Sequence, residues 1–74
     1  MTTLQERVFK VIAEVMALDV SEIALDAPIV DELDLIEIIM DLETEFDITI
    51  PDSETFEINA VSDAVRIVEK HANT

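Results

Sequence analysis

The stretch that decides the fold is Leu33-Asp34-Leu35-Ile36-Glu37-Ile38-Ile39-Met40-Asp41-Leu42-Glu43-Thr44-Glu45-Phe46, and the helix breaker Pro51 follows it. At about 100° of rotation per residue, its apolar side chains fall on two separate faces of one helix. The first face is a complete core-facing stripe made of Leu35, Ile38, Ile39, Leu42 and Phe46. The second is a strip surrounded by acids and made of Leu33, Ile36 and Met40. We therefore predict a helix over Leu33–Phe46 that has two apolar faces, of which only one is needed to pack against a core.

The strip Leu33, Ile36 and Met40 has two interpretations. It is a docking surface for a partner that has a basic surface and a hydrophobic pocket, or the connection at 19–31 folds over it and buries it. We favour docking, because 14 acidic residues and no basic residue lie between Asp19 and Glu57. The partner-binding residues expected on this interpretation are Leu33, Asp34, Ile36, Glu37, Met40, Asp41 and Asp47.

Further helices are expected on both sides of this one. Thr3 and Glu6 have the spacing of a capping box, in which each side chain bonds the other residue's free backbone N–H. Asp31 or Glu32 is favourable at the positive end of the second helix. The helical segments expected, in chain order, are Met1–Leu18, Leu33–Phe46, a short turn at Ser53–Glu57, and Val61–His71 with Asn59 or Ser62 as its cap.

The remaining apolar residues complete the expected core. The connection at 19–31 is long for so small a chain, so we expect its apolar residues to pin it onto the bundle: Val20, Ile23, Leu25, Ile29 and Val30. Phe46 and Phe56 are expected in the core as well. The fold class predicted is all-α, a single domain over residues 1–74 built as a small four-helix bundle with three main helices plus one short helix.

Composition excludes several classes of function. The chain has 74 residues, of which 18 are acidic and 4 basic, and a formal net charge of −14. This charge excludes nucleic acid and an anionic membrane surface as main partners. There is no cysteine and no glycine, and the one histidine, His71, is expected to be exposed near a helix end. A thiolate or histidine-cluster metal site, a thiol nucleophile and a glycine-rich phosphate loop therefore lack their residues, and the acids lack the spacing of a calcium-binding loop, so no metal is expected. We expect a cytoplasmic monomer that is not an enzyme.

The stretch at 34–52 resembles the acyl carrier protein family. In that family an acidic helix that ends in Leu-Glu-x-x-Phe, here Leu42-Glu43-Thr44-Glu45-Phe46, is followed by an Ile-Pro-Asp turn, here Ile50-Pro51-Asp52. The segments at 3–8, 30–33 and 58–61 are similar to the family's first helix, loop end and entry to the last helix. The resemblance implies a small four-helix fold, docking on enzymes through the second helix, and acyl groups carried on phosphopantetheine.

The resemblance breaks at the residue that holds the prosthetic group. Family members have Asp-Ser-Leu at the start of the second helix, and the serine hydroxyl bears phosphopantetheine through a phosphodiester. Aligned without a gap, Glu32 stands nearest the position of that serine. Aligned on Val30-Asp31-Glu32-Leu33, a short Gly-Ala-Asp-Ser-Leu-like segment is missing instead, and we prefer this alignment because it also explains the absent glycine. A carboxylate cannot replace the hydroxyl nucleophile, so no cofactor and no cofactor-binding residue is expected.

Other hydroxyls are expected to serve the fold. Ser21 is expected to cap a turn, Ser53 and Ser62 are expected to cap later helices, and Thr44 faces outward without a preceding aspartate. Thr2 and Thr3 precede the first helix. None of them is expected to be an attachment site.

Three functions remain open on this sequence. The one we favour is an acyl-carrier-like module of fatty-acid or polyketide-type biosynthesis that docks on basic surfaces of enzymes, or on a dedicated partner, through its acidic second helix and cannot carry phosphopantetheine at the usual site. The second is a working carrier modified at another hydroxyl. The third is a helical bundle that binds acyl chains without a covalent bond.

Overall fold

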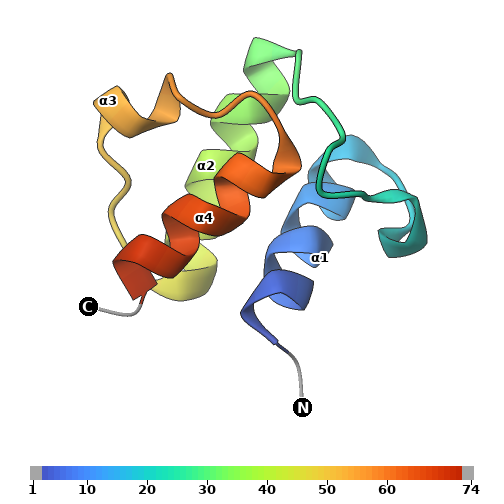
Figure 1. The fold of residues 1–74 in the computed structure, drawn as a ribbon, viewed down its shortest axis with the longest axis horizontal. Helices are drawn as coiled ribbons and strands as arrows, with labels where there is room; N and C mark the ends of the chain where they lie inside the picture. Colours follow the sequence, from blue (N-terminus) through green and yellow to red (C-terminus); the bar gives the residue numbers. More distant parts are fainter. Residues whose placement is uncertain (1–2, 73–74) are drawn as a thin grey trace.

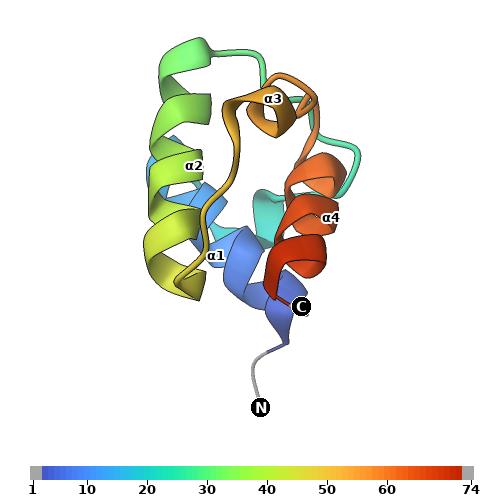
Figure 2. The ribbon, with the colours of Figure 1, turned by 90° about the vertical axis from the view of Figure 1, so that its left-hand side faces the viewer.

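The computed structural model describes residues 3–72, so the helix start predicted at Met1 and the hydroxyl of Thr2 lie outside the described residues. The elements in chain order are α1 (Leu4–Met16), a 3₁₀ turn (Val20–Glu22), α2 (Glu32–Phe46), α3 (Asp52–Thr55) and α4 (Val61–Ala72). Figures 1 and 2 show α1 running opposite to α2 and α4, with the one-turn helix α3 between α2 and α4 at one end of the bundle. The predicted all-α bundle of three main helices and one short helix is confirmed.

The helix starts follow the predicted capping chemistry. The Glu6 backbone N–H donates to Thr3 Oγ1 at 3.1 Å, and the Thr3 backbone N–H donates to Glu6 Oε1 at 3.4 Å, which completes the capping box. At α2, the backbone N–H groups of Leu33 and Asp34 donate to Asp31 Oδ1 at 2.8 and 3.2 Å. Asp31 is therefore the N-cap, and α2 begins at Glu32, one residue before the predicted start.

Two helix ends adopt a left-handed backbone without glycine. Ala17 ends α1 with φ 57°, and Asp47 ends α2 with φ 54°. This conformation costs roughly 1–2 kcal/mol for a residue with a β-carbon, and closing hydrogen bonds such as Asp47 N–H to the Glu43 carbonyl offset it. The turn at Asp47 sends the segment at 48–51 back along α2 (Figure 2), which forms one wall of the site described below.

The core is built on the predicted stripe of α2. Ile38, Ile39 and Leu42 are buried, while Leu35 and Phe46 are half-buried and pack against the same cluster. The other buried side chains come mainly from α1 and α4: Val8, Val11, Ile12, Ala13, Val61, Ala64, Val65, Ile67 and Val68. The core face of α2 was therefore predicted correctly from periodicity.

Two core expectations outside the main helices are wrong. Phe56 is 84% exposed, because Ile58, two residues later, takes the core position and is only 3% exposed. In the connection at 19–31, Ile23 and Ile29 are buried as expected, but Val20, Leu25 and Val30 are 45%, 43% and 86% exposed. Of these exposed residues, Phe56 and Val30 flank the start of α2, where the candidate site lies.

Candidate functional site

The second apolar strip of α2 lies on the surface. Leu33, Ile36 and Met40 are 72%, 52% and 60% exposed. The connection at 19–31 does not cover them, because it is bonded to the entry of α4: the Ile29 N–H donates to the Asn59 carbonyl at 2.9 Å and the Val61 N–H to the Ala27 carbonyl at 3.0 Å. The interpretation that this connection buries the strip is therefore wrong.

The acidic residues predicted to surround the strip form no ion pair within residues 3–72. Glu37, Asp41 and Asp47 are exposed, and Asp34 is half-buried. Within residues 3–72, the ion pairs go to other acids: Arg7 pairs with Glu45, Arg66 with Asp63, and Lys70 and His71 with Glu54. The surface of α2 therefore combines exposed apolar side chains with uncompensated negative charge. We use "docking face" below for Leu33, Asp34, Ile36, Glu37, Met40, Asp41 and Asp47.

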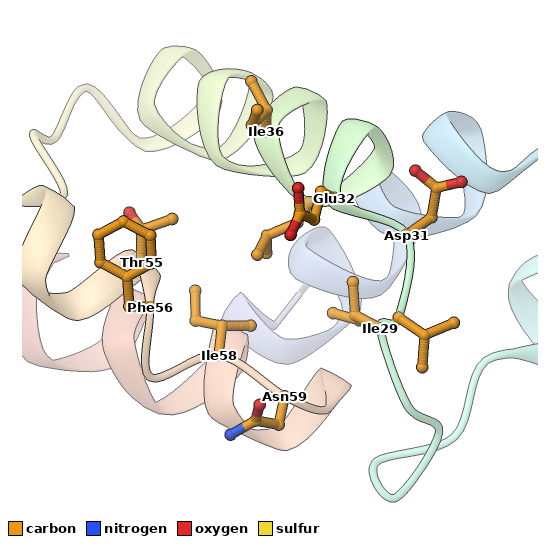
Figure 3. A pocket seen from close by; sticks show the side chains of 10 residues that line it. Ile29, Asp31, Glu32, Ile36, Thr55, Phe56, Ile58 and Asn59 are labelled. Carbon is orange, nitrogen blue, oxygen red and sulfur yellow. The ribbon is translucent and has the colours of Figure 1, made fainter.

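A groove runs beside the docking face, between α2 and the returning chain at 48–59. Its first part is a cavity of about 320 Å³ at the start of α2. Figure 3 shows Glu32 and Ile36 of α2 across this cavity from Thr55 and Phe56. Its second part, about 480 Å³, lies further along α2 and shares Ile36 and Thr55 with the first. The groove floor is apolar, with Ile29, Leu35, Ile36, Ile39, Met40, Ile50 and Ile58 among its lining residues.

Sequence reasoning missed Val30, Thr55 and Phe56 as members of this site. All three line the first cavity, and Val30 and Phe56 are the two most exposed large apolar residues of the described chain. A usable signal was present, since Phe56 falls outside the helical apolar periodicity of its neighbours. Assigning it to the core rested on residue type alone.

The wall formed by α3 is fastened to α4 by one carboxylate. Glu54 Oε1 bonds Lys70 Nζ, and Glu54 Oε2 contacts His71 Nε2, from the last turn of α4. The Glu54 side chain is 13% exposed, whereas that of Lys70 is 66% exposed. The hydrogen bond from Lys70, followed by that from His71, holds the pKa of the Glu54 carboxyl below its ordinary value. His71 is therefore a half-buried partner of Glu54 rather than the exposed residue we expected.

We expect Glu54→Gln to lower Tm at neutral pH and to remove part of the acid sensitivity. Because the folded-state pKa of Glu54 lies below the ordinary value of 4.5, its ion pairs stabilise the fold above that value, and the contribution is lost as the pH falls through the folded-state pKa. Thermal unfolding followed by circular dichroism from neutral to acid pH checks this. The difference in Tm between the two proteins should close toward acid pH, and the exposed Glu69→Gln should show no such pattern. A difference of constant size across the range would contradict the ion-pair explanation.

The start of α2 does not fit covalent attachment of a group through an ester of phosphate. Its first residues are Asp31, Glu32, Leu33 and Asp34, which provide carboxylates and an apolar side chain but no hydroxyl. The Asp31 carboxylate is already engaged as the N-cap. A phosphodiester placed here would also lie among like charges without a nearby base.

Several hydroxyls elsewhere differ from their expected roles. The residue before α3 is Pro51, and no side chain caps this helix, so Ser53 is not a cap. At α4, the backbone N–H groups of Asn59 and Ala60 donate to Asp63 Oδ2 at 2.9 and 3.1 Å, so Ser62 is not a cap either. Ser21 donates from Oγ to Asp19 Oδ1 at 2.9 Å and is held in the 3₁₀ turn as expected.

Comparison with known proteins gives a consistent result. The sequence pattern of the family described as "Phosphopantetheine attachment site" matches residues 6–68. The chain is 40% identical over 79 aligned positions to an acyl carrier protein of Azobacteroides pseudotrichonymphae, covering 99% of this chain and 93% of the relative. It is 37% identical over 71 positions to an acyl carrier protein of Clostridium acetobutylicum, covering 89% of this chain and 92% of that relative.

The comparisons correct the expectation about the cofactor. We expected none, and that expectation is wrong: the matched family is described by attachment of phosphopantetheine, and both relatives are named as acyl carrier proteins. Phosphopantetheine is therefore the prosthetic group that the family of this chain implies. Which atom of this chain it meets is a separate question, since the start of α2 offers no hydroxyl.

Proposed function

The chain belongs to the acyl carrier protein family, which serves the biosynthesis of acyl compounds, and from this premise we propose that it is a carrier-type module that docks on biosynthetic enzymes through the docking face of α2. The observation that carries the proposal is the exposed strip of Leu33, Ile36 and Met40 within a field of unpaired carboxylates. Large apolar side chains left exposed together on a highly charged small domain are typical of an interaction surface.

The charge distribution supports a basic partner. The formal net charge is −14, and the four basic side chains (Arg7, Lys10, Arg66 and Lys70) all lie on α1 and α4. A surface of one sign attracts an oppositely charged partner over a distance and orients it before contact. We propose basic surfaces of fatty-acid or polyketide synthesis enzymes, or a dedicated partner protein, as the class that fits.

The docking proposal predicts a large effect from two alanine substitutions. Ile36→Ala combined with Met40→Ala removes most of the central apolar area of the strip, and we expect at least tenfold weaker binding to a purified ketoacyl synthase of fatty-acid synthesis. Leu18→Ala with Leu25→Ala is the matched control, because these side chains are also exposed, 40% and 43%, but lie outside the docking face. Titration calorimetry measures both. Equal affinities for the two double variants would contradict the proposal.

We propose that phosphopantetheine is not attached at the start of α2. The match to the relative from Azobacteroides runs over 79 positions and this chain has 74 residues, so at least five of those positions are gaps in this chain. A gap of this size is what the alignment with a missing Gly-Ala-Asp-Ser-Leu-like segment requires. The residues at this end of α2 include the carboxylates of Asp31 and Glu32 and no hydroxyl, which supports the proposal that the group is not attached there.

A second candidate function is favoured by the groove. Its first cavity is lined by apolar side chains, including Ile29, Leu35 and Ile58, so an acyl chain could be held there without a covalent bond. Amide chemical shifts measured during titration with fatty acids of increasing length test this candidate. Shifts of residues 29–36 and 55–59 that grow with chain length would support it, and an unchanged spectrum would exclude it.

The remaining features of the proposal follow from the family and the fold. We propose a single domain that acts as a monomer in the cytoplasm and has no catalytic activity of its own. No helix within residues 3–72 has the length and apolar character that crossing a membrane requires. High net charge of one sign opposes self-association, which supports the monomer.

A further inference from the structure

The cavity at the start of α2 presents two groups that the docking face does not include, an aromatic ring and a carboxylate. The Phe56 side chain is 84% exposed and lines one wall, and Glu32, the first residue of α2, lines the wall across from it (Figure 3). The floor between them is apolar and includes Ile29, Leu35 and Ile58. A ring, a carboxylate and an apolar floor around one cavity suit an alkyl chain that ends in a positive charge.

Glu32 provides the carboxylate that is available to such a ligand. Glu32 is exposed, and its side chain forms no hydrogen bond or ion pair within residues 3–72. The neighbouring Asp31 carboxylate, by contrast, accepts the backbone N–H groups of Leu33 and Asp34 at 2.8 and 3.2 Å. In the described part of the chain, no basic residue lines the cavity. The chain therefore does not itself compensate the Glu32 charge.

The sum of the charges at this end of α2 is negative. The free backbone N–H groups of a helix start carry about half a positive charge, which opposes a cation. Asp31, Glu32 and Asp34 place three carboxylates in and beside the same turn, and their combined charge outweighs that of the helix start. The mouth of the cavity therefore attracts a cation and repels a ligand that carries a carboxylate.

The same chain binds an arginine with these two groups elsewhere. The Arg7 guanidinium lies 4.3 Å from the centre of the Phe46 ring, and Arg7 Nε donates to Glu45 Oε2 at 3.0 Å. Phe56 and Glu32 offer a ring and a carboxylate of the same kind at the other end of α2. Arginine suits them better than lysine does, because its flat guanidinium can stack on a ring while it bonds a carboxylate and is less strongly hydrated than an ammonium.

Both walls of the cavity are held in place by bonds within the chain. Glu54, two residues before Phe56, fastens α3 to the last turn of α4. The backbone N–H of Phe56 donates to the Asp52 carbonyl at 3.3 Å. Glu32 begins a helix whose start is capped by Asp31. Groups that are ordered before contact lose little conformational entropy when a ligand binds.

We propose that this cavity receives one arginine side chain of the partner enzyme, an inference that deepens the proposed function and rests on it. The aliphatic part of the arginine lies on the apolar floor of Ile29, Leu35 and Ile58. Its guanidinium pairs with Glu32 and stacks on Phe56. The docking face attracts the partner and supplies apolar contact, whereas this arginine anchors the partner at one point and fixes its position along α2.

The test is the kinetics of binding to the purified ketoacyl synthase, measured by surface plasmon resonance. Glu32→Gln keeps the size of the side chain and removes its charge, and Phe56→Leu keeps an apolar side chain and removes the ring. We expect the dissociation rate constant to rise about tenfold in Glu32→Gln and about threefold in Phe56→Leu. The effect falls on dissociation because a charge pair inside a filled cavity breaks only when the complex separates.

A double variant and a matched control show whether one cation is responsible. Because both substitutions act on the same guanidinium, Glu32→Gln with Phe56→Leu should raise the dissociation rate constant by less than the product of the two single effects. Glu69→Gln removes one exposed carboxylate from α4 and should dissociate at the wild-type rate. Glu32 and Phe56 are exposed, so both variants should keep the wild-type circular dichroism spectrum.

Three results would overturn the arginine site and leave docking through α2 intact. The first is a wild-type dissociation rate in both single variants, while Ile36→Ala with Met40→Ala still binds weakly. The second is a loss in Phe56→Leu alone, which would identify an apolar occupant such as an acyl chain or an aliphatic side chain. The third is an equal loss in Glu32→Gln and Glu69→Gln, which would identify bulk charge as the cause. A wild-type protein that does not bind the synthase would reject the proposed function and this inference with it.

Discussion

Leu42→Ala is expected to leave a large part of the protein unfolded at room temperature. Leu42 lies in the middle of α2 and is 0% exposed, in contact with the core cluster that α1 and α4 complete. Truncating a buried leucine costs about 2–5 kcal/mol, through lost burial and the cavity left behind. A chain of 74 residues has a total stability of only about 4–11 kcal/mol, and repulsion within a net charge of −14 places this one at the low end.

Met40→Ala is the matched control on the same helix. It removes a side chain of similar size that is 60% exposed and faces away from the core. Its free energy of unfolding should differ from wild type by no more than about 0.5 kcal/mol. Urea unfolding followed by circular dichroism measures both variants. If the two substitutions cost the same, the assignment of separate core and docking faces to α2 is wrong.

Charge reversal on the docking face is expected to have the second large effect. Glu37→Lys with Asp41→Lys replaces two exposed carboxylates beside the strip with cations. Electrostatic steering raises association rates by roughly 10–10³-fold, so we expect the association rate constant with the ketoacyl synthase to fall at least tenfold at low salt. The difference in association rate between the wild type and this variant should shrink as salt is raised, because salt screens the attraction between the wild-type carboxylates and the basic partner.

A control with the same change in net charge separates this face from the molecule as a whole. Glu14→Lys with Glu69→Lys places two cations on exposed positions of α1 and α4. Stopped-flow association at several salt concentrations should show a much smaller loss for this control. Equal losses in both double variants would mean that bulk charge, and not the docking face, governs encounter.

Periodicity and capping chemistry were sufficient to predict the framework of the fold. The core stripe of α2, the capping box of Thr3 and Glu6, and a favourable acid at the start of α2 (Asp31 or Glu32) all depend on neighbours within a few residues along the chain. Such local relations can be derived from helix geometry alone. The family resemblance depended on the same helix and the turn after it.

The path of the connections could not be derived in this way. Whether the strip at Leu33, Ile36 and Met40 is covered depends on the bonds that tie Ile29 and Ala27 to the entry of α4, which are contacts between distant parts of the chain. The groove depends on the left-handed turn at Asp47. Glycine is the usual sequence signal for such a turn, and this chain has none. The cofactor expectation failed for another reason: it was drawn from one position at the start of α2, whereas the match to the family covers residues 6–68.

The most direct test of the docking proposal is a map of the amide signals of the isotope-labelled protein during titration with unlabelled ketoacyl synthase. We predict that the perturbed signals form one continuous patch over the docking face and the groove wall, at 30–47 and 48–56, while the outer faces of α1 and α4 keep their shifts. Perturbations centred on α1 or α4, or a spectrum unchanged at saturating synthase, would contradict docking through the acidic face of α2.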